Sequence, residues 1–109
     1  MYGDPGRIAP GTLEGYMQPL LINGTWDYGL NVVACWKSDL TKLASAYSKI
    51  KHQTLLMWGD RDPAVFVKSA QDVQNAIAGS RLHVFPSVGH LPYEEVPHDF
   101  NAVLLDFMK

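Results

Sequence analysis

The second half of the chain, from about residue 51 onward, alternates regularly between strand-like and helix-like hydrophobic patterns. A continuous apolar run at 54–58 ends in Gly59 and predicts a strand that is buried on both faces. A second apolar strand is expected at 82–85. Between them, apolar residues at helical spacing predict a helix that ends at Gly79; they are Phe66, Ala70, Val73 and Ile77. This stretch therefore predicts a βαβ unit with parallel strands and a right-handed crossover.

The end of the chain predicts one more helix. Pro97 suits its first turn, where the missing backbone N–H of proline costs nothing. Lys109 suits its C-terminal end, because a positive charge there complements the helix dipole. The residues expected to form its buried face are Phe100, Val103, Leu104 and Phe107.

The first half of the chain, 1–50, is aromatic and rich in turn signals, and it predicts short helices without strands. Thr12 is expected to cap a helix that stops at Pro19. A second helix is expected from about Trp26 to about Trp36, although Gly29 weakens that pattern. A third helix, capped by Ser38 or Asp39, is expected to present an apolar stripe made of Leu40, Leu43, Ala44 and Tyr47.

Composition limits the classes of function that the chain can have. With 47% hydrophobic and 18% charged residues, its 109 residues are typical of a globular protein with a sizeable core. The formal net charge of -2 is spread along the chain, so we expect neither a nucleic-acid partner nor a membrane partner. The single cysteine, Cys35, and the lack of a signal-like first segment indicate a cytoplasmic location.

Two candidate functional residues follow the two predicted strands. Asp62 lies in the loop after the first strand, and His90 lies in the loop after the second. Because parallel strands end at the same edge of a sheet, we expect the two side chains to lie close together despite 28 residues of separation. A carboxylate beside an imidazole is the arrangement by which a histidine base is oriented toward a nucleophile. Taken singly, Asp62 could equally be a turn residue, and His90 could be a surface loop residue.

Two sequence runs extend this interpretation to a family. The run at 55–63, Leu-Leu-Met-Trp-Gly-Asp-Arg-Asp-Pro, resembles the segment of α/β-hydrolases that ends the penultimate strand and supplies the triad acid. The run at 89–97, Gly-His-Leu-Pro-Tyr-Glu-Glu-Val-Pro, resembles the histidine loop of that family and the start of its last helix. The resemblance implies an α/β fold that is the C-terminal fragment of a hydrolase. Residues 1–50 would be the end of the helical cap with a return helix, and 51–109 the core strand-helix-strand-helix segment.

The resemblance also implies roles for individual residues. Asp62 would be the acid and His90 the general base, and neither a metal nor an organic cofactor is expected. Asp60 competes with Asp62, but Asp62 holds the Gly-x-x-Asp position before Pro63. The chain departs from the family pattern at Phe66-Val67, where a proline often follows the acid.

The nucleophile of such a triad is missing from this sequence. It would lie in a Gly-x-Ser-x-Gly turn between a strand and a helix, and Ser87-Val88-Gly89 is only a partial match inside the histidine loop. We therefore expect a fragment whose missing N-terminal core segment supplies the nucleophile, so that the chain alone is inactive. The expected substrate is a small organic molecule, first of all a carboxylic ester. The alternatives are an epoxide hydrolase, a haloalkane dehalogenase, a hydrolase of carbon-carbon bonds, or a non-catalytic interaction module.

Several other residues have a structural and a functional interpretation. The aromatic residues Trp26, Tyr28, Trp36 and Tyr47 are expected to pack between helices, and the alternative is that they line a substrate pocket under a cap. Cys35 is expected to be buried and inert. Glu94 and Glu95 are expected to stabilise the start of the last helix, with contact to the histidine loop as the alternative. The remaining histidines, His52, His83 and His98, lack the spacing of metal ligands.

Overall fold

The computed structural model describes the backbone of all 109 residues and every side chain except those at positions 37, 41 and 44. Its contacts divide the chain into two compact units. One unit combines Met1–Ile8 with Tyr47–Lys109, and the other is Ala9–Ala46. The first eight residues thus pack with the second half of the chain, although they adjoin the helical region in the sequence.

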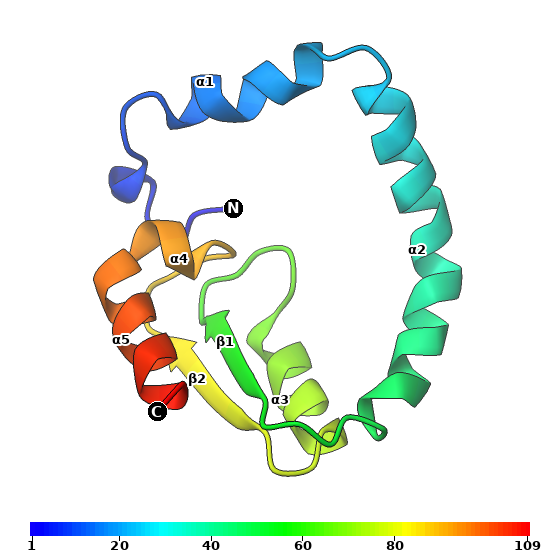
Figure 1. Cartoon of the computed structure of the whole chain (residues 1–109). Helices are drawn as coiled ribbons and strands as arrows, with labels where there is room; N and C mark the ends of the chain where they lie inside the picture. The colour runs from blue at the N-terminus through cyan, green and yellow to red at the C-terminus, as the bar shows by residue number, and fades with distance from the viewer. The chain divides into compact units, whose positions relative to one another are not determined.

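The first unit is built on a parallel βαβ arrangement, as the hydrophobic pattern predicts (Figure 1). Strand β1, Leu55–Gly59, pairs with strand β2, Arg81–Phe85, and helix α3, Val67–Ala76, connects them. The register runs from Leu55 opposite Arg81 to Gly59 opposite Phe85, so both strands end at the same level. The positive φ of Gly79, 77°, turns the chain from α3 into β2.

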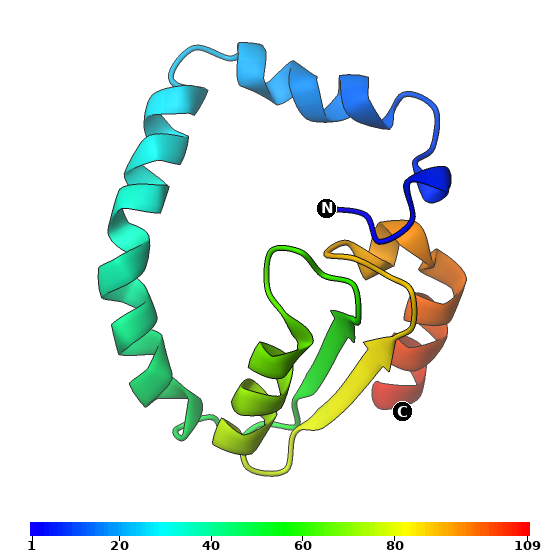
Figure 2. The ribbon, with the colours of Figure 1, turned by 180° about the vertical axis from the view of Figure 1, so that it is seen from behind.

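Two helices cover the two faces of this small sheet. Helix α5, Pro97–Phe107, lies on the face opposite α3, and the short helix α4, Pro92–Glu95, leads into it (Figures 1 and 2). Phe85 of β2 stacks on Phe100 of α5, with ring centroids 6.1 Å apart. Among the described side chains, the buried hydrophobic core lies in this unit; its residues are Ala70, Ile77, Phe85, Val88 and Leu91.

Burial in this unit is shallower than the sequence predicts. The strand β1 was expected to be buried on both faces, but only Gly59 is buried and its other residues are partly exposed. The expected buried face of α5 is likewise only half-buried, and Phe66 precedes α3 with 71% of its surface exposed. A two-stranded sheet explains the difference, because strands of a larger parallel sheet are covered by neighbours that two strands do not supply.

The second unit consists of helices, but fewer and longer ones than expected. Helix α1, Thr12–Met17, continues into the 3-10 turn η2, Gln18–Leu21. Gly11, with a φ of 82°, precedes α1, so Thr12 is its first helical residue and does not cap it. The two predicted helices that follow are a single helix, α2, Thr25–Tyr47.

The predicted break near Ser38 is wrong for a local reason. The Ser38 hydroxyl donates to the carbonyl of Cys35, one turn earlier, so it bonds within the helix and caps no new one. Of the stripe expected on the third helix, Leu40 and Leu43 are exposed, and the side chain of Ala44 lies outside the described residues. None of the helices, as far as they are described, is long and apolar enough to cross a membrane.

Candidate active site

The loops that follow β1 and β2 are joined by their backbones. The N–H of Asp60 donates to the carbonyl of Phe85 (3.1 Å), and the N–H of Arg61 donates to the carbonyl of Val88 (2.9 Å). Gly59 makes this approach possible, because a Cβ at this position would collide with the backbone of the second loop. The two loops, 60–66 and 86–91, therefore form one structural unit at the edge where both strands end.

This edge brings together the two residues that the sequence singles out. Nδ1 of His90 lies 2.7 Å from Oδ2 of Asp62. The other carboxylate oxygen of Asp62 accepts hydrogen bonds from the N–H groups of Ala64 (2.8 Å) and Val65 (2.9 Å). Asp62 is thus both a turn residue and the partner of His90.

The surroundings of Asp62 favour its charged form. Burial would raise the pKa of this carboxyl group, because only 7% of the residue is exposed. The hydrogen bond from the N–H of Val65 lowers it, as do the His90 side chain and the N–H of Ala64. Together these bonds outweigh the burial and hold the pKa of Asp62 below its ordinary value.

The contact with Asp62 fixes which nitrogen of His90 is available for chemistry. An ionised carboxylate only accepts hydrogen bonds, so Nδ1 carries a proton, and in the neutral form of the imidazole the free lone pair lies on Nε2. The imidazole is 35% exposed and borders a small cavity of about 130 Å³. The cavity is lined by Met57, Trp58, Gly59, Asp62, Val65, His90 and Pro92.

Asp60, the competing candidate for the acid, has a different partner. Its Oδ1 accepts a hydrogen bond from the backbone N–H of Ser87 (2.6 Å). Ser87 has a φ of 58°, a conformation that is uncommon for a residue with a side chain, and the carboxylate of Asp60 holds it there. Asp60 thus shapes the histidine loop, whereas Asp62 contacts the imidazole.

Comparisons with known proteins find similarity to hydrolases. No protein-family model matches the chain. The 2-hydroxy-6-oxononadienedioate/2-hydroxy-6-oxononatrienedioate hydrolase of Escherichia coli (strain K12 / DH10B) is 38% identical over 61 residues, which are 56% of this chain and 21% of the relative. A CIB-like hydrolase from Thermoplasma acidophilum superposes on 62% of this chain and 32% of its own, with a TM-score of 0.60 and 34% identity. These matches show that the chain has part of an α/β-hydrolase fold.

A further hydrolase structure supports the same assignment. The CarC enzyme, a serine hydrolase involved in carbazole degradation, matches 60% of this chain and 25% of its own, with a TM-score of 0.58 and 29% identity. The chain spans about a fifth of the length of the curated relative from Escherichia coli. It corresponds to the C-terminal part of the α/β-hydrolase fold, as the two sequence runs predict.

Glu95 has a different role at this site from the one that the sequence mainly predicts. Glu95 was expected to stabilise the start of the last helix, but its side chain is fully buried under the histidine loop. There its Oε1 accepts a hydrogen bond from the N–H of Gly89 (2.7 Å), the residue before His90. The alternative, contact with the loop, is therefore correct for Glu95.

The other candidates do not join the site. Among the side chains that are described, no group of three or more His, Cys, Asp or Glu residues is placed to hold a metal ion. His83 packs its ring against Phe85, with centroids 4.5 Å apart, on the side of β2 that faces α5. Cys35, which was expected to be buried, is exposed on α2.

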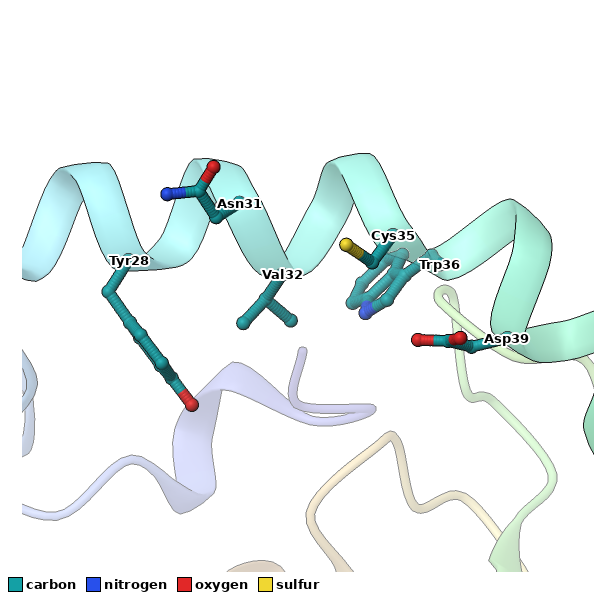
Figure 3. Close-up of a pocket in the computed structure, with 6 residues that line it drawn as sticks. All are labelled: Tyr28, Asn31, Val32, Cys35, Trp36 and Asp39. Carbon is teal, nitrogen blue, oxygen red and sulfur yellow. The ribbon is translucent and has the colours of Figure 1, made fainter.

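A shallow hollow of about 400 Å³ runs along α2 (Figure 3). Figure 3 shows that Tyr28, Val32 and Trp36 project from the same side of the helix, with Asp39 at one end. Trp26, Tyr28 and Trp36 are 63%, 73% and 58% exposed, so these aromatic residues do not pack between helices as expected. Their alternative role, lining a substrate pocket, remains a prediction.

Proposed function

We propose that this chain supplies the acid and the base of a nucleophile-His-Asp triad in a hydrolase that acts on a small organic substrate. The observation that carries the proposal is the 2.7 Å contact between Nδ1 of His90 and Oδ2 of Asp62 at the shared edge of two parallel strands. The nucleophile and the donors for the oxyanion would come from other sequence, because this chain contains no Gly-x-Ser-x-Gly turn.

The geometry is consistent with a separate step for each side chain in such a reaction. Nε2 of His90 would take the proton of the nucleophile as it attacks the substrate, and would then give that proton to the leaving group. Asp62 would hold the imidazole in the tautomer that has Nε2 free, and its charge would stabilise the imidazolium. The low pKa of Asp62 keeps that charge in place at neutral pH.

The proposed substrate is a carboxylic ester, in which a carbonyl carbon accepts the nucleophile and an alkoxide leaves. The leaving alkoxide needs a proton, which the imidazolium of His90 can donate. The same residues would serve other carbonyl substrates, because the fold alone does not select the bond that is cleaved.

One observation favours a second candidate, the hydrolysis of a carbon-carbon bond next to a carbonyl group. The Escherichia coli relative is named as a hydrolase of 2-hydroxy-6-oxononadienedioate and 2-hydroxy-6-oxononatrienedioate, compounds with a carbonyl group at position 6. In this candidate, His90 and Asp62 keep their roles, and the leaving group is a carbon atom that must be protonated.

Substitutions in the full-length protein test the proposal. We expect His90→Ala and Asp62→Asn each to lower kcat by roughly 10⁴-fold or more, whereas the matched variant Asp60→Asn retains most activity. The assay would compare p-nitrophenyl acetate with a 2-hydroxy-6-oxo dienoate, which distinguishes the two candidates. Equal losses in Asp60→Asn and Asp62→Asn would contradict the assignment of the acid. A folded protein that hydrolyses neither compound would favour the interaction module instead.

A further inference from the structure

We infer that Glu95 is a positioning residue for His90: its carboxylate fastens the N-terminal segment, Met1–Arg7, to the histidine loop and so fixes the backbone from which the imidazole projects. This inference rests on the proposed function, because it concerns how the proposed base is held. It assigns a role to a residue that is not among those lining the cavity beside His90.

The contacts of Glu95 reach two segments that are distant in the sequence. Oε1 accepts hydrogen bonds from the N–H of Gly89 (2.7 Å) and the N–H of Gly3 (2.9 Å). Oε2 accepts one from the N–H of Asp4 (3.2 Å) and lies 3.5 Å from the guanidinium of Arg7. A single carboxylate therefore joins the residue before His90 to three residues of the N-terminal segment.

Burial shows that these bonds matter energetically. The side chain of Glu95 is 0% exposed, and a buried carboxylate is costly unless hydrogen bonds and an opposite charge compensate for the lost water. A helix start could be stabilised by an exposed carboxylate at no such cost. The buried position is explained by what the carboxylate binds, which is the backbone of two segments.

The backbone of His90 is held by the same segment. Its N–H donates to the carbonyl of Met1 (2.7 Å). Gly89 permits this close packing, because a Cβ there would collide with the backbone of Met1 and Gly3. The Tyr2 hydroxyl also donates to the carboxylate of Glu94, the neighbour of Glu95. His90 is thus fixed twice, through its ring by Asp62 and through its backbone by the segment that Glu95 anchors.

The test uses Glu95→Gln in the full-length protein, with Asp99→Asn as the matched control. Glutamine has nearly the same shape, but one of its two acceptor oxygens becomes an NH₂ donor facing backbone N–H groups. We expect kcat to fall roughly 10- to 100-fold while KM stays within about twofold, because a slightly displaced base impairs proton transfer more than binding. Asp99, which is exposed at the start of α5, should tolerate the same change without effect.

A spectroscopic readout separates this inference from the proposed function. In the unsubstituted protein, the Nδ1 proton of His90 should give a downfield NMR resonance because it is shared with Asp62, and the amide of His90 should exchange slowly. Glu95→Gln should broaden or shift that resonance and speed the exchange at least tenfold. If the unsubstituted protein hydrolyses nothing, the proposed function fails, yet this NMR comparison still decides the role of Glu95.

A second variant guards against a Glu95→Gln protein that does not fold. Arg7→Gln removes the guanidinium that faces Glu95 and that also donates to the carbonyl of Ser87 (3.0 Å), but leaves the backbone hydrogen bonds in place. We expect it to fold and to change the same resonance and the same exchange rate in the same direction by a smaller amount. Folded variants at both positions with unchanged kcat and an unchanged His90 resonance would overturn the inference.

Discussion

The two compact units of this chain differ in the sequence separation of the residues that their hydrogen bonds join. In Met1–Ile8 with Tyr47–Lys109, hydrogen bonds join segments more than 80 residues apart, as between Glu95 and Gly3. In Ala9–Ala46, most of the hydrogen bonds are local ones within helices, and the large apolar side chains of α2 are exposed. The first unit is therefore held by its own long-range bonds, whereas the second exposes large apolar side chains along α2.

The largest expected effect of this difference is on association. We expect the 109-residue chain on its own to self-associate or to fold poorly, and to hydrolyse no ester, because the residues of α2 leave apolar surface in water. Replacing Trp26 and Trp36 by Glu should shift size-exclusion elution toward the monomer, whereas Phe66→Glu, an exposed change in the first unit, should not. A monomer that unfolds cooperatively without any substitution would contradict the fragment interpretation.

The second effect concerns two glycines, one in each unit, whose surroundings are opposite. Gly59→Ala would drive a Cβ into the backbone of Val88 and Gly89, so we expect the full-length protein to lose roughly 2–4 kcal/mol of unfolding free energy. Gly29→Ala is the matched variant, since a Cβ there meets nothing within 4 Å. It should be neutral or stabilise α2 by up to about 1 kcal/mol. Urea unfolding measures both, and equal effects would remove the distinction between the units.

The third effect is the response to acid. Since the pKa of Asp62 is lowered in the folded state, the unfolded state binds more protons, and stability must rise with pH through this range. The contribution of Asp62 is present above the unfolded pKa of about 3.9 and is lost as the pH falls below it. Thermal melts between pH 5 and 3 should show that Asp62→Asn flattens this dependence. Asp39→Asn, on the exposed surface of α2, should leave the slope unchanged.

The smallest effect should be the same in both units. Asp39 and Lys42 form an exposed ion pair in α2 (3.2 Å), and Lys68 and Asp72 form one in α3 (3.5 Å). Neutralising either pair should cost less than about 0.5 kcal/mol and should lose its effect in high salt. Urea unfolding measures the loss of unfolding free energy. A larger loss in either helix would contradict the view that the pair is a weak, solvent-exposed interaction.

The sequence predicted the first unit well because its signals are local and strong. The apolar run of β1, the helical spacing around Ala70 and the stop at Gly79 each depend on neighbouring residues only. Once the strands are parallel, their ends coincide, and the contact between Asp62 and His90 follows. The choice of Asp62 over Asp60 as the acid came from a resemblance and stays a prediction. In the structure, Asp62 contacts the ring of His90, and Asp60 accepts a hydrogen bond from the backbone of Ser87.

The parts that escaped prediction depend on long-range contacts. A glutamate near a helix start can lie in water or turn inward, and nothing around Glu95 in the sequence reveals that Gly3 and Asp4 will donate to it. Two glycines, Gly59 and Gly89, were the available signals, since each permits close approach of a backbone. In α2 the wrong prediction came from a local signal. Ser38 was expected to cap a new helix, but its hydroxyl bonds to a carbonyl inside the continuous helix.

The continuity of α2 has a mechanical consequence. An unbroken helix of 23 residues is a stiff rod about 34 Å long, with no hinge at its centre. Any rearrangement of this rod must pivot at its ends, at the turn around Gly24 with its φ of 89° and at the turn that follows Tyr47. The residues that line the hollow of α2 therefore stand on one unbroken helix, with no bend between Tyr28 and Asp39.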